Sequence, residues 1–279
     1  MPKLQSAQLV VVSDLHVGSK IGLMPPTVEL DDGNIVSQNQ LQKDAWKYWT
    51  KEFWPYVENR SKGRKTVVVL NGDGLDGVHH NTTQIWSNDP LEQAVVAAEI
   101  MAPIANKYPV YVTRGTPTHV LVSGAGDELI AREIGAKQPV KGRKVHSSYH
   151  LKLVLEGVDF DIAHHGPSAG TRIWTYGNAL RGYARTIILD AMVQHRRPPD
   201  CIIRSHFHHR VHETTHDYGH TCHAIITPAW QWKSEYVHMV VSHEDVCDIG
   251  GVVIDIDDGK ITNVDIRTIQ FVQSDRVVA

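Results

Sequence analysis

The feature that most constrains this chain is a series of short apolar runs, each followed by residues of metal-binding type. The first run, Leu9–Val12, leads into Asp14 and His16. A run that is apolar throughout predicts a strand buried on both faces. Residues two apart in an extended chain point to the same side, so Asp14 and His16 can present a carboxylate oxygen and an imidazole nitrogen together. Such a pair can form half of a site for a divalent ion.

Four later predicted strands end in the same way. Asp73 follows the second strand, Thr116 and His119 follow the third, His164 and His165 a later one, and His206 and His208 the last of the series. In α/β proteins, sites form at the carboxyl ends of strands, so we expect these residues to meet. A carboxylate such as Asp73 can bridge two cations that lie about 3.5–4 Å apart.

The order of the predicted elements indicates the fold class. Early strands alternate with apolar-faced helical segments at 39–60 and 89–107, and later strands cluster after a helical segment at 171–197. This order predicts an α/β protein in which two mixed sheets pack on each other between outer helices, a four-layer α/β/β/α sandwich. With 42% hydrophobic residues and no clear linker in 279 residues, we expect a single domain over 1–279, with insertions at 17–38 and 74–90.

Composition limits the partners and the compartment. The net charge of −3 argues against a broad cationic surface for duplex DNA, although it allows a local basic groove. The three cysteines contain no C-x-x-C pair, which favours a reducing compartment. There is no signal-peptide pattern and no apolar run of about 18 residues, so we expect a cytoplasmic protein without a membrane partner.

Histidine is the outlier, with 18 in the chain and seven between His206 and His223. Such density can mean metal ligation, but it also makes a His-x-His pair easy to obtain by chance. His206 and His208 are therefore candidate metal ligands only because they belong to the ordered series of strand ends. A mixed oxygen and nitrogen donor set suits Mn²⁺, Fe, Zn²⁺ or Ni²⁺ better than Mg²⁺ or Ca²⁺.

The ordered blocks resemble those of the calcineurin-like metallophosphoesterase superfamily. That family carries D-x-H, G-D-x-x-D, G-N-H-[DE], a histidine before glycine, and G-H-x-H, all at strand ends. The corresponding residues here are Asp14-Leu-His16, Gly72-Asp-Gly-Leu-Asp76, His165-Gly166 and Ser205-His206-Phe-His208. The resemblance spans residues 9–208, and the long loop after the first block is similar to phage-type members.

The resemblance implies a centre with two divalent ions, Mn²⁺ being favoured, with Fe, Zn²⁺ or Ni²⁺ as alternatives. One ion would be bound by Asp14, His16, Asp73 and His208. The other would share Asp73 and add His165 and His206. His165 is favoured over His164 because it directly precedes Gly166.

Two positions depart from the family pattern. Ser205 replaces the glycine before His206, and Gly115-Thr-Pro-Thr-His119 replaces Gly-Asn-His-Asp. Thr116 thus stands where the family has its asparagine ligand. His119 comes two residues late, so it either acts as the acid for the leaving group or has become a ligand of the second ion. The acid role is favoured because Asp76, whose family counterpart orients that histidine, is present.

The function implied is a metal-dependent phosphoester hydrolase, with direct attack on phosphorus by a hydroxide that bridges the two ions. We expect a phosphodiesterase or nuclease acting on nucleic acid or nucleotides, with Arg114 and Arg172 as candidate phosphate contacts. A surface salt bridge at Arg114 and an ordinary amphipathic helix after Arg172 remain the alternatives. The competing functions are a phosphomonoesterase or protein phosphatase and a non-catalytic metal-binding scaffold. The oligomeric state is left open.

Overall fold

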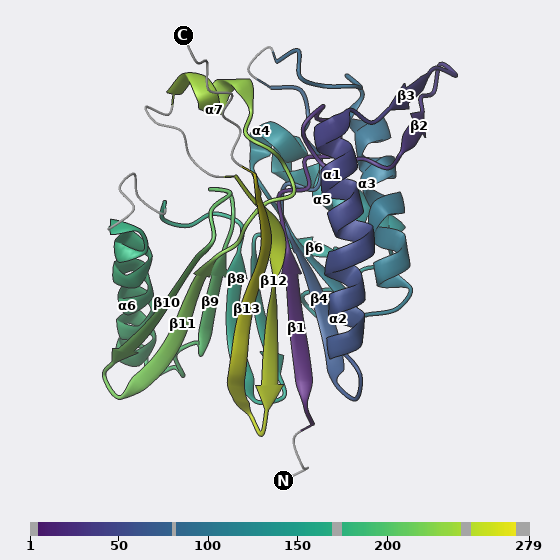
Figure 1. Ribbon diagram of the computed structural model, residues 1–279. Helices are drawn as coiled ribbons and strands as arrows, with labels where there is room; N and C mark the ends of the chain where they lie inside the picture. Colours follow the sequence, from purple (N-terminus) through teal and green to yellow (C-terminus); the bar gives the residue numbers. More distant parts are fainter. Residues whose placement is uncertain (1–4, 80–81, 169–174, 241–246, 272–279) are drawn as a thin grey trace.

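The computed structural model describes residues 5–79, 82–168, 175–240 and 247–271, and it contains two sheets between outer helices (Figure 1). The first sheet has the order β13-β12-β1-β4-β5-β6, in which β1, β4, β5 and β6 are parallel and β12 runs antiparallel to β1. Its strands are β1 (Ala7–Val12), β4 (Lys65–Asn71), β5 (Val110–Thr113), β6 (Ser147–Ser148), β12 (Cys247–Asp257) and β13 (Lys260–Phe271).

The second sheet has the order β10-β11-β9-β8-β7. Its central strands β8, β9 and β11 are parallel, and the two edge strands are antiparallel to their neighbours. The strands are β7 (His150–Leu155), β8 (Val158–Ala163), β9 (Cys201–Arg204), β10 (Val211–Asp217) and β11 (His220–Ile226). Both sheets are mixed, as predicted.

The two sheets pack face to face through an apolar layer. Leu9 and Val11 of β1 and Val69 of β4 lie in one buried cluster with Phe160 and Ile203 from the second sheet. The alternate residues of β1 and β4 point to the opposite side, towards the helices. The strands are therefore buried on both faces, as their unbroken apolar runs predicted.

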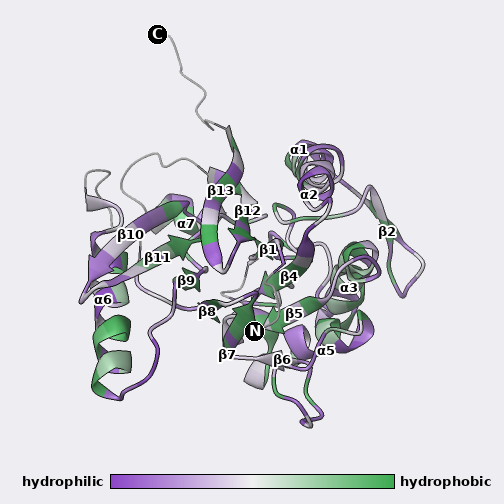
Figure 2. Cartoon of the chain, turned by 90° about the horizontal axis from the view of Figure 1, so that it is seen from below, coloured by the Kyte–Doolittle hydropathy of each residue, from purple (hydrophilic) through white to green (hydrophobic). Residues whose placement is uncertain are grey.

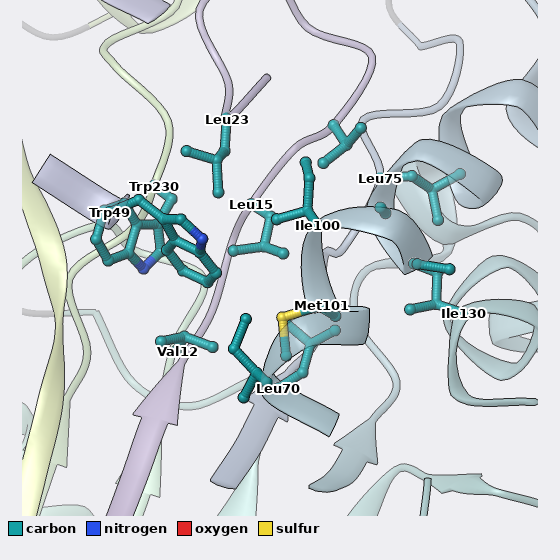
Figure 3. Packing of buried hydrophobic residues seen from close by; sticks show 14 of the residues in the cluster. Val12, Leu15, Leu23, Trp49, Leu70, Leu75, Ile100, Met101, Ile130 and Trp230 are labelled. Atoms are coloured by element: carbon teal, nitrogen blue, oxygen red, sulfur yellow. The ribbon is translucent and has the colours of Figure 1, made fainter. Parts of the chain in front are cut away.

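Helices cover the two outer faces (Figures 1 and 2). The first sheet packs against α1 (Gln40–Tyr48), a π-helical turn (Trp49–Phe53), α2 (Trp54–Arg60), α3 (Pro90–Ala105) and α5 (Ala125–Glu133). Figure 3 shows part of this cluster, with Leu70 of β4 beside Met101 of α3. The second sheet packs against α6 (Asn178–Val193). The predicted four-layer sandwich is confirmed.

Local structure agrees with most of the predicted elements. Asp89 caps α3 by accepting the Leu91 N–H, with Pro90 in the first helical position. The insertion predicted at 17–38 contains a short hairpin, β2 (Thr27–Glu29) and β3 (Ile35–Ser37). The remaining short elements are α4 (Pro117–Val120), the 3₁₀ turn Val122–Gly124 and α7 (Glu235–Val240). Among the described residues, no helix is both long and apolar enough to cross a membrane.

Candidate metal centre

The loops that follow β1, β4, β5, β8 and β9 meet at one end of the sandwich. The parallel pairing of β1 and β4 continues past the strand ends, because the N–H groups of Asp14 and His16 donate to the carbonyls of Gly72 and Asp73 at 3.0 and 3.1 Å. Asp14 and Asp73 are therefore placed side by side by main-chain hydrogen bonds. This is the edge of the sheets at which the sequence predicted a site.

Five of the predicted ligands have a left-handed backbone, which non-glycine residues rarely adopt. Their φ angles are 54° for Asp14, 44° for His16, 50° for Asp73, 75° for His206 and 55° for His208. Each such residue costs on the order of 1–3 kcal/mol, and such residues cluster at functional sites. Five such residues lie close together here. The strained backbone therefore lowers local stability, and it directs these side chains towards one site.

The first cluster of donor atoms consists of Asp14, His16 and His208. Asp14 Oδ1 lies 3.2 Å from His208 Nε2 and 3.8 Å from His16 Nε2. Asp14 Oδ1 and His16 Nε2 are buried, and neither makes a hydrogen bond to any described residue. A buried polar atom without a partner costs free energy. The two unpartnered atoms, one oxygen and one nitrogen, fit ligation of a divalent ion.

Asp76 lies behind His16. Its Oδ1 accepts from His16 Nδ1 at 2.9 Å and from Gln231 Nε2 at 3.2 Å. Burial would raise the pKa of Asp76, but hydrogen bonds from His16 and His79 hold it well below its usual range. A carboxylate that accepts the Nδ1–H of a histidine fixes its tautomer and leaves Nε2 free to bind metal. The carboxylate of Asp76 thus orients His16.

The second cluster surrounds the hydroxyl of Thr116. Thr116 Oγ1 lies 3.0 Å from Asp73 Oδ2, 3.1 Å from His206 Nδ1, and 3.3 Å from the Nε2 atoms of both His164 and His165. Neighbouring ligands of an octahedral ion with bonds of about 2.1 Å lie roughly 3.0 Å apart. The four contacts of Thr116 have nearly this spacing. The donor set therefore fits a shared ion with Thr116 as one of the donors.

Both members of the His164-His165 pair reach this cluster. His164 is 1% exposed, and its Nε2 lies 2.9 Å from Asp73 Oδ2. Its Nδ1 lies 2.8 Å from the carbonyl of Asn71, to which it donates. His165 is exposed and approaches Thr116 from the solvent side. The geometry thus adds His164, which the sequence interpretation had ranked second, to the donors near His165.

Asp73 lies between the two clusters. Its carboxylate groups with His16 and His119 of the first cluster's surroundings, and also with Asp14 and with His164 of the second cluster. Burial would raise the pKa of Asp73, but the neighbouring imidazoles, His164 foremost, hold it well below its usual range. For Asp14, His164 and His208 likewise outweigh burial and lower the pKa to about 2. Both carboxylates are ionised at neutral pH and can bind cations.

His119 lies beside the first cluster. Its Nδ1 lies 2.8 Å from the main-chain carbonyl of Asp76 and 3.8 Å from the Asp76 Oδ1 atom. The ring of His119 is 4.6 Å from that of His16 and 4.4 Å from that of His79. Burial and the proximity of His16 lower the pKa of His119 to about 4. In the absence of substrate, its Nε2 is therefore an acceptor at neutral pH.

Arg114 and Arg172 were predicted as phosphate contacts, and the structure describes only Arg114. Arg114 donates to Ser147 Oγ at 2.9 Å and lies 3.6 Å from Glu128, as the salt-bridge alternative expects. Arg172 lies outside the described residues. In the helix that follows, Arg181 pairs with Glu213 and Arg185 pairs with Asp217.

Sequence reasoning missed Asp127, His79 and Gln231. Asp127, in the first turn of α5, accepts the N–H groups of Gly74 and Gly115 at 3.1 and 2.7 Å. It is fully buried, and burial together with Asp73 raises its pKa to about 7. Its only sequence signal was an acidic residue at a helix start, which usually interacts with the helix N-terminus.

Searches with this sequence found neither a protein-family model nor a curated protein that matches it. The structure has distant neighbours among solved structures. A Streptococcus pneumoniae protein described as a predicted phosphoesterase is 11% identical, with a TM-score of 0.37 and coverage of 94% of this chain and 90% of the other. Vps29 of Entamoeba histolytica, solved with Zn²⁺, is 12% identical, with a TM-score of 0.39 and coverage of 94% and 98%.

A third neighbour is the sulfate thiohydrolase SoxB of Thermus thermophilus. It is 11% identical, with a TM-score of 0.42, and the match covers 97% of this chain and 57% of that one. Similarities at this level do not assign an activity. The fold and the donor clusters themselves define a two-sheet sandwich with an aspartate- and histidine-rich centre at the carboxyl ends of its strands.

Proposed function

We propose that this protein is a metal-dependent phosphoester hydrolase with two divalent ions in one centre. The observation that carries the proposal is the position of Asp73 between a cluster of Asp14, His16 and His208 and a cluster that surrounds Thr116. One bridging carboxylate with separate nitrogen donors on either side is the pattern of a two-metal site. The five histidine donors, His16, His164, His165, His206 and His208, favour Mn²⁺, Fe, Zn²⁺ or Ni²⁺ over Ca²⁺ or Mg²⁺.

Two ions bound here would neutralise the charge that builds up on a phosphoryl group and activate water for an in-line displacement. The protein's own residues hold the donors in place. Asp76 fixes the ring of His16, and the main-chain carbonyl of Asn71 fixes that of His164. His119 lies against the first cluster with its Nδ1–H engaged, so its Nε2 is the atom that can meet a leaving group.

We propose phosphodiesters of nucleic acid or nucleotides as the substrate class, with phosphomonoesters as the competing class. The basis is the segment from Arg172, which combines planar cations with aromatic residues. Arg181 and Arg185 are paired with acidic residues. The candidate substrate contacts are therefore the residues from Arg172 to the start of α6. The discriminating experiment is a matrix of metals against diesters, monoesters and single-stranded DNA.

The first prediction concerns Asp73→Asn, which removes the charge shared by both clusters. We expect Mn²⁺-dependent hydrolysis of bis-(p-nitrophenyl) phosphate to fall at least about 10³-fold, because a two-metal site loses its bridging anion. Circular dichroism should show an unchanged fold. Asp190→Asn, at a carboxylate 57% exposed on α6, is the control and should keep full activity.

The alternative of a non-catalytic metal-binding scaffold makes a different prediction. The wild-type protein would then bind ions at Asp73 and hydrolyse neither diesters nor monoesters under any metal. That result would overturn the proposed activity while keeping the metal centre.

A further inference from the structure

A chain of buried polar side chains crosses from the first sheet to the second directly beneath the candidate centre. Thr113 Oγ1 donates to Asn71 Oδ1 at 2.6 Å, and Asn71 Nδ2 donates to Ser205 Oγ at 2.6 Å. Ser205 Oγ and Thr227 Oγ1 are 2.7 Å apart. All four side chains are fully buried. We refer to Thr113, Asn71, Ser205 and Thr227 as the polar bridge.

The polar bridge joins the strand ends that carry the donors. Asn71 ends β4 and Thr113 ends β5, both in the first sheet, whereas Ser205 follows β9 and Thr227 follows β11 in the second. Asn71 is two residues before Asp73, and Ser205 directly precedes His206. A shift of one sheet against the other at this end would therefore break the bridge and separate the donors.

The main chain of Asn71 adds two more links to the donors. Its carbonyl accepts from His164 Nδ1 at 2.8 Å and from the hydroxyl of Ser13, the neighbour of Asp14, at 2.9 Å. Asn71 Nδ2 also donates to the carbonyl of Ala163 at 3.1 Å. A single residue thus contacts segments that carry donors in both sheets.

The polar bridge differs in character from the rest of the layer between the sheets. The layer between the sheets is otherwise built from residues such as Val69 and Phe160. Apolar side chains of equal volume can be as stabilising as hydrogen-bonded polar ones, whereas polar networks specify a single geometry. What the bridge adds to an apolar layer is a fixed distance and register between the sheets.

We propose that the polar bridge is a positioning device that sets the separation between the donors of the first sheet and those of the second. The inference rests on the proposed metal centre. Ser205 is the informative member, because the blocks that this sequence resembles have glycine before the first histidine. The Ser205 hydroxyl links Asn71 to Thr227 at the centre of the bridge. A glycine at this position would lack that hydroxyl, so the serine has a physical role here.

The test uses variants that delete one hydroxyl each. Ser205→Ala removes the central link, and Thr227→Val removes the outer link with little change of volume. Thr227→Ser keeps the hydroxyl and is the conservative rescue. The matched control is Thr66→Val, which deletes a buried threonine hydroxyl at the other end of β4, 3.4 Å from Gln8 Oε1.

Two readouts separate positioning from general stability. Calorimetry with Mn²⁺ gives the number and affinity of bound ions, and electron paramagnetic resonance reports the exchange coupling between two neighbouring Mn²⁺ ions. We expect Ser205→Ala and Thr227→Val to lose affinity for the second ion about 10-fold or more, as for other residues that orient ligands, and to lose the coupled spectrum. Thr227→Ser should retain both, and Thr66→Val should lower only the unfolding temperature.

Wild-type affinity and an unchanged coupled spectrum in both hydroxyl-deleting variants would overturn the positioning role while leaving the metal centre in place. The same holds if Thr66→Val weakens metal binding as much as they do. A wild-type protein that binds no Mn²⁺ would instead overturn the proposed function, and this inference with it. If Ser205→Ala fails to fold, the Thr227→Val and Thr227→Ser pair decides alone.

Discussion

His164 shows how a single residue of the centre responds to its neighbours. Burial would lower its pKa, but Asp73 and Asp14 outweigh burial and raise the pKa from 6.5 to about 10. In the metal-free protein this histidine therefore keeps its proton at neutral pH and loses it only as the pH rises towards 10. His206 behaves in the opposite way, because burial and the charge of His164 lower its pKa to about 4.

Metal binding at the second cluster should accordingly release a proton from His164. We expect about one proton per second ion bound at pH 7, and an affinity that increases as the pH rises from about 6.5 towards 10. Calorimetry in two buffers of different ionisation enthalpy measures the release. If the binding enthalpy is the same in both buffers, or if the affinity falls over this pH range, metal binding does not remove a proton from His164.

The role of His119 can be assigned by measuring how the activity of a His119 variant depends on the leaving group of the substrate. If it is the acid, His119→Asn should slow hydrolysis of a substrate with an alkoxide leaving group by about 10²–10⁴-fold. Hydrolysis of a p-nitrophenyl ester, which needs no proton, should change little. A pKa of about 4 in the free protein means that the substrate's negative charge must raise it before a proton is available. Equal losses for both substrates, with loss of a bound ion, would instead assign His119 as a ligand.

At the level of elements, α5 holds two of the site loops through Asp127. One oxygen of this carboxylate accepts from Gly74, and the other accepts from Gly115. Gly115 allows no side chain, because a Cβ there would lie 2.1 Å from Asp73 Oδ1. The loops after β4 and β5 are thus packed against each other and fastened to one helix start.

Asp127→Asn should therefore destabilise the protein as well as the centre. An amide offers one acceptor oxygen and directs its NH₂ group at the second N–H donor, so we expect a loss of about 1–3 kcal/mol of unfolding free energy. Urea unfolding in the presence of a chelator measures this loss without metal. The exposed Asp190→Asn should change the unfolding free energy by less than about 0.5 kcal/mol. Equal values for the two variants would contradict the role given to Asp127.

The elements were predictable where one local pattern determined them. Unbroken apolar runs predicted β1 and β4, and the apolar-faced segment at 89–107 predicted α3, which spans Pro90–Ala105. The β2–β3 hairpin was missed because its segment is polar and only the central Val28 of β2 is buried. Asp127 was missed because its partners are main-chain N–H groups more than ten residues away, which no local pattern reveals.

At the scale of the whole molecule, the sandwich brings together residues separated by almost 200 positions. Sequence order predicted that Asp14 and His208 share a site, and their atoms lie 3.2 Å apart. The sequence favoured His165 over His164, but both follow the same strand, and both Nε2 atoms lie 3.3 Å from Thr116 Oγ1. Only the packing of the two sheets shows that His164 is the buried one of the pair. The polar bridge could not be predicted from the sequence, because it joins residues from two sheets that are far apart along the chain.

The central claim is that two ions flank Asp73, and crystals grown with Mn²⁺ test it directly. Anomalous scattering recorded near the manganese edge locates the ions independently of any activity. We predict two peaks about 3.5–4 Å apart. One should lie beside Asp14, His16 and His208, and the other beside Thr116 and the imidazoles of His164, His165 and His206. A single peak, or peaks remote from Asp73, would contradict the account.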